Sequence, residues 1–443
     1  MELKDIIEVL SPLNFWGREQ EIGIKREEYL NKIAELSEAK DMAVSITGIR
    51  RCGKTTLAKQ YLKENIEKGF KKEQTLYINF EEPKFEPYLN TDFLDEIYRA
   101  YRTFINRDES CIIVLDEVQN LTGWEKWVRI MLEKKEKAKI IITGSNSKLI
   151  DSELSTVLTG RALVKRAYPL DFAEFLLFKG NEMQKSQYMA KAGIIRNNMI
   201  EYILSGGFPQ IINEKENLKA EILKEIFYGI INKDIINRYG FKNPHLVKVT
   251  AELIINNYSS LLSANRLRNS LVNIFKENLS PNHIIEIMKS FEDTYLLHYV
   301  PLFSKKVKQI KQYPKKIYCV DTGIINVVAL KYCQNFGKLA ENIVAVYLIR
   351  KYRKENIFYW RNIQQEEVDF IIKENFDVSQ IIQVCWNMDE EKTRKREIRS
   401  LLKAAEEFNL DKGLIITENT QTEEIVENKK IICIPLWKWL LEN

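Results

Sequence analysis

Eight consecutive residues near the start of the chain have the types and spacing of a phosphate-binding loop. They are Gly48-Ile49-Arg50-Arg51-Cys52-Gly53-Lys54-Thr55, between the apolar run 42–46 and a helix-forming stretch that begins at Thr56. The glycines allow backbone N–H groups to curve around phosphate oxygens, and the helix N-terminus adds the positive end of its dipole. Lys54 can reach the β- and γ-phosphates, and the Thr55 hydroxyl suits Mg²⁺. Residues 48–56 are therefore predicted to bind a nucleoside triphosphate.

A second pair of candidate residues, Asp116 and Glu117, ends the apolar run 111–115. A continuous apolar run is typical of a strand that is buried on both faces of a parallel sheet. One carboxylate at such a strand tip can hold Mg²⁺, and its neighbour can polarise the attacking water. We assign Asp116 as the metal ligand and Glu117 as the catalytic base. Two acidic residues that open a surface loop are the alternative.

Polar residues also follow the next expected strand, 139–143. Ser145 or Asn146 would face the γ-phosphate from that neighbouring strand and sense hydrolysis, although a Ser/Asn turn that caps a helix would have the same composition. Arg161 could supply positive charge to the transferring phosphoryl group, or it could be a solvated arginine. The apolar residues of 124–132 recur at helical spacing and are predicted to be core.

Together these elements resemble an AAA-type ATPase, specifically the prokaryotic, often archaeal, family whose P-loop has the form G-x-R-R-x-G-K-T-T. The resemblance covers nearly the whole chain in order. Its further motifs are Leu115-Asp116-Glu117-Val118-Gln119, Ile142-Thr143-Gly144-Ser145-Asn146, Leu158-Thr159-Gly160-Arg161, Gly206-Gly207-Phe208-Pro209, Asp321-Thr322-Gly323, Glu341-Asn342, Tyr359-Trp360-Arg361 and Glu367-Val368-Asp369-Phe370. The family implies ATP and Mg²⁺ as cofactors and a helical lid that is ordered by nucleotide.

Composition agrees with an enzyme of the cytoplasm. The chain has 443 residues, enough for two or three domains, and its formal net charge of +5 is mild. Six scattered cysteines form no C-x-x-C pair and are expected to be reduced, and three histidines make a histidine-based zinc site an unfavoured assignment. The N-terminus lacks a signal-peptide pattern, and no apolar run approaches the roughly 18 residues of a membrane span. No membrane partner is expected.

Local charge is concentrated between residues 305 and 316, where six lysines occur without one acidic residue. The region that contains these lysines is predicted to be a winged helix with a basic wing. Its elements would be helices from about 245, a strand over 293–303, a lysine-rich turn and a returning strand over 316–320. Lys305, Lys306, Lys308 and Lys311 would then neutralise DNA phosphates in a salt-sensitive contact. The alternative is a solvated hairpin tip that blunts aggregation.

The last hundred residues follow the order helix, three strands, helix, strand, which resembles the PD-(D/E)xK nuclease core. In that fold a helical Glu, a strand Asp and a (D/E)-x-K on the next strand bind Mg²⁺, and the matching positions are Glu341, Asp369 and Gln383-Val384-Cys385. Gln383 is a weaker Mg²⁺ ligand than a carboxylate, and Cys385 lacks the fixed charge of lysine. Lys392 or Arg394 could replace that charge. We therefore predict a degenerate nuclease fold that binds DNA or dimerises; Glu341 and Asp369 could also be an ordinary acidic surface pair.

The fold class is α/β with four parts: an AAA-type P-loop ATPase domain (1–168), a helical lid (169–240), a winged-helix region (241–334) and a nuclease-like domain (335–443). The predicted function is Mg²⁺-dependent ATP hydrolysis that drives a conformational switch, with nucleic acid as the expected partner. Two alternatives stay open: an ATP-dependent DNA nuclease of a mobile-element or defence system, and a regulatory ATPase that binds a protein partner. The oligomeric state is also left open.

Overall fold

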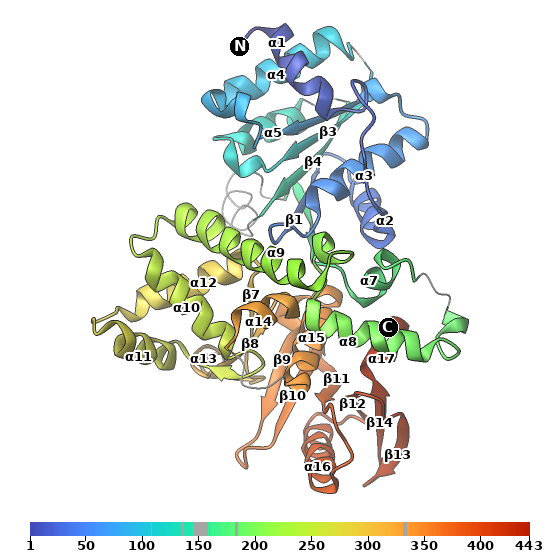
Figure 1. Ribbon diagram of the computed structural model, residues 1–443, viewed down its shortest axis with the longest axis vertical. Helices are drawn as coiled ribbons and strands as arrows, with labels where there is room; N and C mark the ends of the chain where they lie inside the picture. Colours follow the sequence, from blue (N-terminus) through green and yellow to red (C-terminus); the bar gives the residue numbers. More distant parts are fainter. Residues whose placement is uncertain (108, 135–136, 146–157, 159, 182–184, 331–334) are drawn as a thin grey trace. The chain divides into compact units, whose positions relative to one another are not determined.

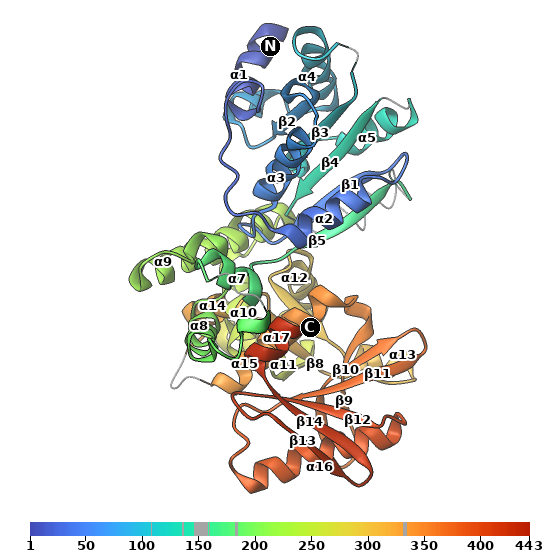
Figure 2. The ribbon, with the colours of Figure 1, turned by 90° about the vertical axis from the view of Figure 1, so that its right-hand side faces the viewer.

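Apolar runs in the first part of the chain form a five-stranded parallel sheet in the order β2-β3-β4-β1-β5 (Figure 1; all five strands are labelled in Figure 2). The strands are β1 Ala43–Gly48, β2 Thr75–Asn79, β3 Cys111–Asp116, β4 Ala138–Gly144 and β5 Ala162–Ala167. All six residues of β1 and of β3 are buried. A strand that is buried on both faces is expected to be largely apolar, which agrees with the continuous apolar run 111–115 of β3. In β1 the buried residues include Ser45 and Thr47.

Helices cover both faces of this sheet. Residues of β3 point alternately to opposite faces, so Ile113 and Leu115 lie in one core cluster with α1, α4 and α5. The other face contacts α3 and α2. These helices are α1 Leu3–Leu10, α2 Glu27–Leu36, α3 Lys54–Glu67, α4 Thr91–Phe104 and α5 Trp124–Glu133. The stripe of Trp124, Trp127, Val128, Met131 and Leu132 is buried, as predicted.

The computed structural model describes residues 1–107, 109–134, 137–145, 158, 160–181, 185–330 and 335–443. They form two units, Met1–Tyr168 and Pro169–Asn443, here called the N-terminal and C-terminal units. The predicted α/β fold class with a parallel P-loop sheet and a further C-terminal sheet is confirmed. The finer division of the C-terminal unit into three domains stays a prediction.

The C-terminal unit begins with helices. They are α7 Phe172–Phe178, α8 Ala192–Ser205, α9 Glu216–Gly229 and the π-helical segment Ile230–Asn237. The first of them starts with a capping box, in which Asp171 and Glu174 accept each other's backbone N–H groups at 2.8 and 3.0 Å.

A small antiparallel sheet follows, with the strand order β6-β8-β7. The elements of this segment are α10 Pro244–Asn256, β6 Leu261–Leu262, α11 Ala264–Phe275, α12 Pro281–Asp293, β7 Leu297–Val300, α13 Val307–Gln312, β8 Lys315–Cys319 and α14 Thr322–Val328. The predicted strand 293–303 is shorter than expected because α12 continues to Asp293. The lysine-rich stretch was expected to be a turn, but it contains the short helix α13.

The last part of the chain forms a six-stranded mixed sheet in the order β13-β14-β12-β11-β10-β9. Helix α16 covers one face, while α15 and α17 lie on the other (Figure 2). The elements are α15 Phe336–Lys351, β9 Ile357–Arg361, β10 Glu367–Glu374, β11 Asp377–Val384, α16 Glu391–Glu407, β12 Lys412–Thr417, β13 Thr422–Val426, β14 Lys429–Pro435 and α17 Leu436–Glu442. Strand β13 and helix α17 were not predicted.

Two of the glycine-containing motifs meet inside the C-terminal unit. Asp321 caps α14 by accepting the N–H groups of Gly323 and Ile324, and its other oxygen accepts the N–H of Gly207 at 2.7 Å. A Cβ at Gly207 would lie 2.2 Å from the Leu170 carbonyl oxygen, and one at Gly323 would lie 2.0 Å from the Ser205 carbonyl oxygen. These glycines are therefore required by close backbone approach, and the motifs have a structural role.

We expect Gly207→Ala to destabilise the C-terminal unit by roughly 1–3 kcal/mol or more, because the added methyl group must displace backbone atoms. Urea unfolding followed by circular dichroism measures this. The matched control is Gly193→Ala, since a Cβ at Gly193 in α8 meets no atom within 4 Å; it should stabilise the helix or leave it unchanged. Equal stability of the Gly207 and Gly193 variants would contradict the packing argument.

Candidate nucleotide site and a second carboxylate cluster

The P-loop, the strand tip of β3 and the end of β4 lie at one edge of the parallel sheet. They meet there because β1 and β3 both pair with β4, and the carboxyl ends of parallel strands share an edge. The loop turns through left-handed backbone at Arg51 (φ 67°) and Gly53 (φ 97°) before α3 starts at Lys54. A Cβ at Gly48 would lie 2.0 Å from the Ala167 carbonyl oxygen, so β5 also requires glycine there.

Asp116 is the centre of this site. Its buried carboxylate accepts hydrogen bonds from the Thr55 hydroxyl at 2.9 Å, the Tyr77 hydroxyl at 2.7 Å and the Thr143 hydroxyl. Burial raises the pKa of Asp116, and the three hydroxyl donors act against that rise. All three donors are neutral, so they orient the carboxylate without cancelling its negative charge.

Glu117 follows in left-handed backbone, with φ 52°. Its backbone N–H donates to Thr143 Oγ1 at 3.0 Å, and its carboxylate accepts from the Gln119 amide. The Lys54 ammonium lies 3.6 Å from the other carboxylate oxygen and donates to the Ile49 carbonyl at 3.3 Å. The structure thus brings the predicted lysine, base and metal-ligand positions together.

The donor set at this edge fits Mg²⁺. The ion prefers hard oxygen ligands and keeps several waters while it binds one or two protein groups and substrate phosphates. The Thr55 hydroxyl and the Asp116 carboxylate are such oxygens and lie 2.9 Å apart. The same edge presents the N-terminus of α3 and the Lys54 ammonium, which suit phosphate.

The remaining predicted loop residues have different environments. Ile49 and Cys52 are buried, and the Cys52 thiol donates to the Ala167 carbonyl at 3.4 Å. Arg50 lies 3.4 Å from Glu81 Oε1, whereas Arg51 and Thr56 are exposed. Ser145 is buried immediately after β4. The alternative residue at that strand end, Asn146, lies outside the described residues.

Arg161 is not near the P-loop. Its carbonyl accepts the N–H of Ala43, at the start of β1, and Gly48 is at the opposite end of that strand. The guanidinium pairs with Glu133 Oε1 at 2.8 Å. Within one chain, Arg161 is therefore not among the predicted site residues that the structure brings together, because parallel strand β5 starts at the amino edge of the sheet.

Three residues of this site were not identified from the sequence. Thr143 was named as the last residue of an expected strand and within the 142–146 motif, but without a role, and Tyr77 carried no signal because it lies within an apolar run of β2. Arg26 is buried and donates to the carbonyls of Cys52 and Tyr168, both at 3.0 Å, so it supports the back of the loop. The clues to Thr143 in the sequence were its position at a strand end and its place in the 142–146 motif.

A second cluster of carboxylates lies in the C-terminal unit. Glu341 on α15 and Asp369 on β10 converge, as the resemblance implied, but an ammonium group lies between them. Lys316 Nζ is 2.6 Å from Asp369, 2.8 Å from Glu367 and 3.1 Å from Glu341. In the part of the chain that the structure describes, no group of acidic, histidine or cysteine side chains has the geometry of a metal site. The predicted second metal site at Glu341 and Asp369 is therefore not supported.

The side chains of Gln383 and Cys385 form hydrogen bonds within the protein. The Gln383 amide oxygen accepts the Asp369 N–H at 3.1 Å, and its amide nitrogen donates to Glu397 at 2.7 Å. Cys385 is buried and its thiol donates to the Asn387 carbonyl. Arg394 pairs with Glu424 on β13 at 2.5 Å, so the cation of the cluster comes from β8 and not from α16.

The four lysines proposed for DNA contact are exposed, in contrast to the two that follow them. Lys305, Lys306, Lys308 and Lys311 lie on α13 or directly before it, and none forms an ion pair with a described residue. Lys315 is half-buried, and Lys316 belongs to the carboxylate cluster. Tyr359 holds both ends of this segment: its backbone pairs with Pro301 and Phe303, and its hydroxyl donates to the Pro314 carbonyl at 2.7 Å.

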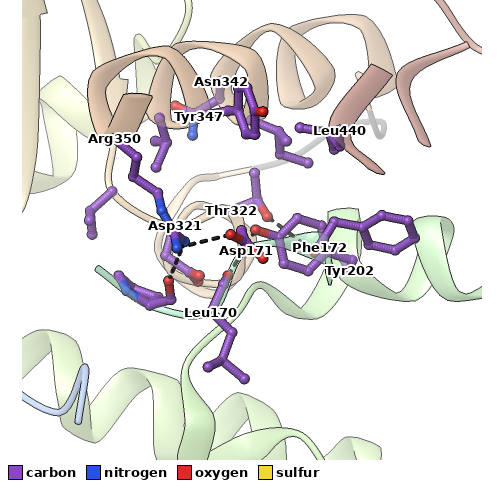
Figure 3. Close-up of a pocket in the computed structure, with 14 residues that line it drawn as sticks. Leu170, Asp171, Phe172, Tyr202, Asp321, Thr322, Asn342, Tyr347, Arg350 and Leu440 are labelled. Carbon is purple, nitrogen blue, oxygen red and sulfur yellow. Dashed lines mark hydrogen bonds and ion pairs between the residues drawn. The ribbon is translucent and has the colours of Figure 1, made fainter. Parts of the chain in front are cut away.

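A cavity within the C-terminal unit is too small for a substrate. It measures about 20 Å³ and is lined by Asp321, Tyr202 and Asn342 among others (Figure 3). That volume suits a single water molecule. Arg350 of α15 also lines the cavity; it pairs with Asp171 at 2.9 Å and with Glu174 at 3.1 Å, and donates to the Pro169 carbonyl at 3.0 Å.

The sheet order, the P-loop and the strand-tip carboxylates define a P-loop ATPase fold of the AAA class. Residues 40–176 match the family model described as an AAA domain. The prediction of an AAA-type P-loop ATPase domain is therefore confirmed. Residues 196–333 match a domain of unknown function, DUF8612, and residues 336–439 match another, DUF4143.

The chain belongs to the family of the uncharacterized protein MJ1544 of Methanocaldococcus jannaschii. The two are 33% identical over 427 residues, which cover 94% of this chain and 92% of that protein. An uncharacterized protein of Haemophilus influenzae is 28% identical, with 94% of this chain and 98% of that protein covered. Among solved structures, the crystal structure of Cdc6p from Pyrobaculum aerophilum is 15% identical, covers 66% of this chain and 91% of its own, and has a TM-score of 0.30, too low to support an argument.

Of the helices in the described ranges, none combines the length and the apolar character needed to cross a membrane.

The carboxylate cluster predicts a pH dependence of stability. Burial, together with the nearby charge of Asp369, raises the pKa of Glu341 from 4.5 to about 7. The native state then binds this proton more tightly than the unfolded state, so the contribution of Glu341 to stability falls as pH rises from about 4.5 to about 7. Glu341→Gln mimics the protonated form, and its stability relative to wild type should therefore improve between about pH 5 and about pH 8.

Urea midpoints at the two pH values measure this change. Glu355→Gln, at an exposed position, is the matched control and should show the same difference from wild type at both. If the stability of Glu341→Gln relative to wild type instead fell as pH rises, Lys316 would stabilise the ionised form of the Glu341 carboxylate.

Proposed function

We propose that this protein is a Mg²⁺-dependent ATPase whose hydrolysis drives a conformational switch. One observation carries the proposal: a P-loop threonine, Thr55, donates to the strand-tip carboxylate of Asp116, while Lys54 and Glu117 lie 3.6 Å apart beside them. P-loop NTPases need this combination, since the loop hydroxyl and the strand-tip aspartate hold the metal and the lysine binds phosphate.

Each residue then has a defined task. Backbone N–H groups of residues 48–56 and the Lys54 ammonium bind the phosphates. Thr55 and Asp116 would hold Mg²⁺, which supplies charge neutralisation at the phosphates when bound. Glu117 takes a proton from the attacking water, and Thr143 orients both acidic residues through its hydroxyl and the Glu117 N–H. Ser145, buried at the end of β4, is proposed to sense the γ-phosphate.

The proposed roles of Asp116 and Glu117 can be separated by isosteric substitution. Glu117→Gln should still bind Mg·ATP but hydrolyse it roughly 10²–10⁴-fold more slowly, because the general base is removed. Asp116→Asn should weaken the Mg²⁺ dependence of ATP binding, and Lys54→Ala should abolish hydrolysis. Phosphate release and fluorescent-nucleotide titration measure these effects.

A suitable control is Arg161→Ala, at the opposite edge of the sheet, which should retain hydrolysis by the single chain. Normal turnover by Glu117→Gln would reverse the assigned roles, and normal turnover by Lys54→Ala would overturn the proposal.

We further propose that the C-terminal unit associates with nucleic acid through its lysine-rich segment. The order of helix, short strand, two helices and two antiparallel strands over residues 244–319 supports a winged-helix arrangement, in which the segment 304–314, including α13, would be the wing. Four exposed lysines without ion pairs among the described residues support a phosphate contact. Val307 and Tyr313, which are 66% and 49% exposed, could add apolar contacts beside them.

Replacing Lys305, Lys306, Lys308 and Lys311 with Gln should weaken DNA binding about equally for different sequences. The slope of log K against log salt should also become shallower by about 0.9 for each phosphate that the variant no longer neutralises. Fluorescence anisotropy at several salt concentrations measures both. A control of equal charge replaces Lys224, Lys395, Lys403 and Lys412, which are exposed elsewhere in the same unit. If the two variants weakened DNA binding equally, the segment would have no specific role in DNA contact and would be a solubilising surface.

The domain that follows is proposed to be a nuclease-like fold without cleavage activity. The order β9-β10-β11-α16-β12, with β11 and β12 parallel, supports the resemblance. Gln383 and Cys385 replace a metal-binding carboxylate and a lysine, and Lys316 occupies the space between the remaining acidic residues. These features favour a platform for DNA or a protein partner over an ATP-dependent nuclease.

A further inference from the structure

The ammonium group of Lys316 is enclosed by carboxylates from two different elements. Glu341 comes from α15, whereas Glu367 and Asp369 come from β10. An ammonium group has three N–H donors, and three carboxylates lie within 2.6–3.1 Å of the nitrogen. The side chains of Lys316 and Asp369 are only 4% and 8% exposed. Such an ion is stable in the interior only when its donors are all paired.

Strand geometry explains why Lys316, and not its neighbour, reaches the cluster. Successive side chains of a strand point to opposite faces. Lys316 and Tyr318 therefore share one face of β8, and the Tyr318 hydroxyl donates to Glu341 at 2.7 Å. Lys315 lies on the other face, 6.0 Å from the Tyr299 ring centroid.

The surrounding contacts hold β8 firmly against this cluster. Asn342, the residue after Glu341, is fully buried, and its amide group exchanges two hydrogen bonds of 2.8 Å with the backbone of Cys319. The other Asp369 oxygen accepts the N–H of Val384 at 2.9 Å. The ammonium position is thus fixed from both the α15 and the β10 side.

The cluster contains more negative than positive groups, as a site that binds a cation does. Three carboxylates face one lysine, and a second cation of the described chain, Arg361, lies at their margin with its Nε 3.9 Å from Glu367. The carboxylate oxygens that a divalent ion would use are therefore already assembled around a positive group.

We propose that Lys316 is a built-in cation that takes the place of a divalent metal ion in the C-terminal domain, so that this site assembles without metal and binds none. Removing the ammonium group should then create a divalent-cation site at Glu341, Glu367 and Asp369. Ligand distances of about 2.0–2.6 Å for such ions require only small movements from the present 2.6–3.1 Å. This inference does not depend on ATP hydrolysis by the N-terminal unit.

The test counts Mn²⁺ ions bound per full-length chain by electron paramagnetic resonance, without nucleotide. Wild type and Asp369→Asn should bind the same number. Lys316→Ala should bind one more, and Lys316→Ala with Asp369→Asn should lose it again. The melting temperature of Lys316→Ala should rise by several degrees on addition of Mn²⁺, with little change for wild type. Lys315→Ala is the matched control and should gain no ion.

Three results would overturn the inference. One is a wild-type Mn²⁺ ion that disappears in Asp369→Asn, which would mean that metal displaces Lys316. Another is a folded Lys316→Ala protein that binds no additional ion. The third is a Lys316→Ala protein that stays unfolded with Mn²⁺ present, because metal should substitute for the ammonium group. A failure of the ATPase proposal would change none of these readings.

Discussion

A carboxylate that is removed from water must be given hydrogen-bond donors or a counter-charge, and the architecture of this protein is organised around three such groups. Asp116 receives three hydroxyl groups from β2, α3 and β4. Asp321 receives backbone N–H groups from two motifs that are more than a hundred residues apart. Asp369 receives the Lys316 ammonium and the N–H of Val384. Each carboxylate joins elements that the chain order alone would not bring together.

The kind of donor decides what each carboxylate can do. Hydroxyl groups orient Asp116 but leave its charge in place, so the group keeps its attraction for a cation and suits a metal-dependent site. At Asp369 the donor is itself a cation, the Lys316 ammonium group, so the negative charge of this carboxylate is already paired within the protein. One chain therefore contains two strand aspartates of similar burial, of which one is suited to chemistry and the other to assembly.

The parts of the fold that depend on local pattern could be predicted from the sequence. The P-loop and the buried strand before Asp116 have strong local signals. Tyr77 could not be found because its role depends on strand pairing, which places β2 beside β3. Lys316 was hidden for a similar reason: it ends a run of lysines, and only the alternation of β8 separates it from the exposed ones. The place of Arg161 could not be predicted because its motif does not show at which edge of the sheet it lies.

Tyr359 contacts both ends of the lysine-rich segment, and these contacts affect how much the length of the segment can change. Because contacts to β9 hold both ends of the segment, residues 304–313, which include α13, form a connection whose ends are held independently of its length. The entropy of closing a loop grows only with the logarithm of its length. Insertions or deletions there should therefore destabilise the sheet little, as long as the contacts of Tyr359 at the two ends of the segment are kept.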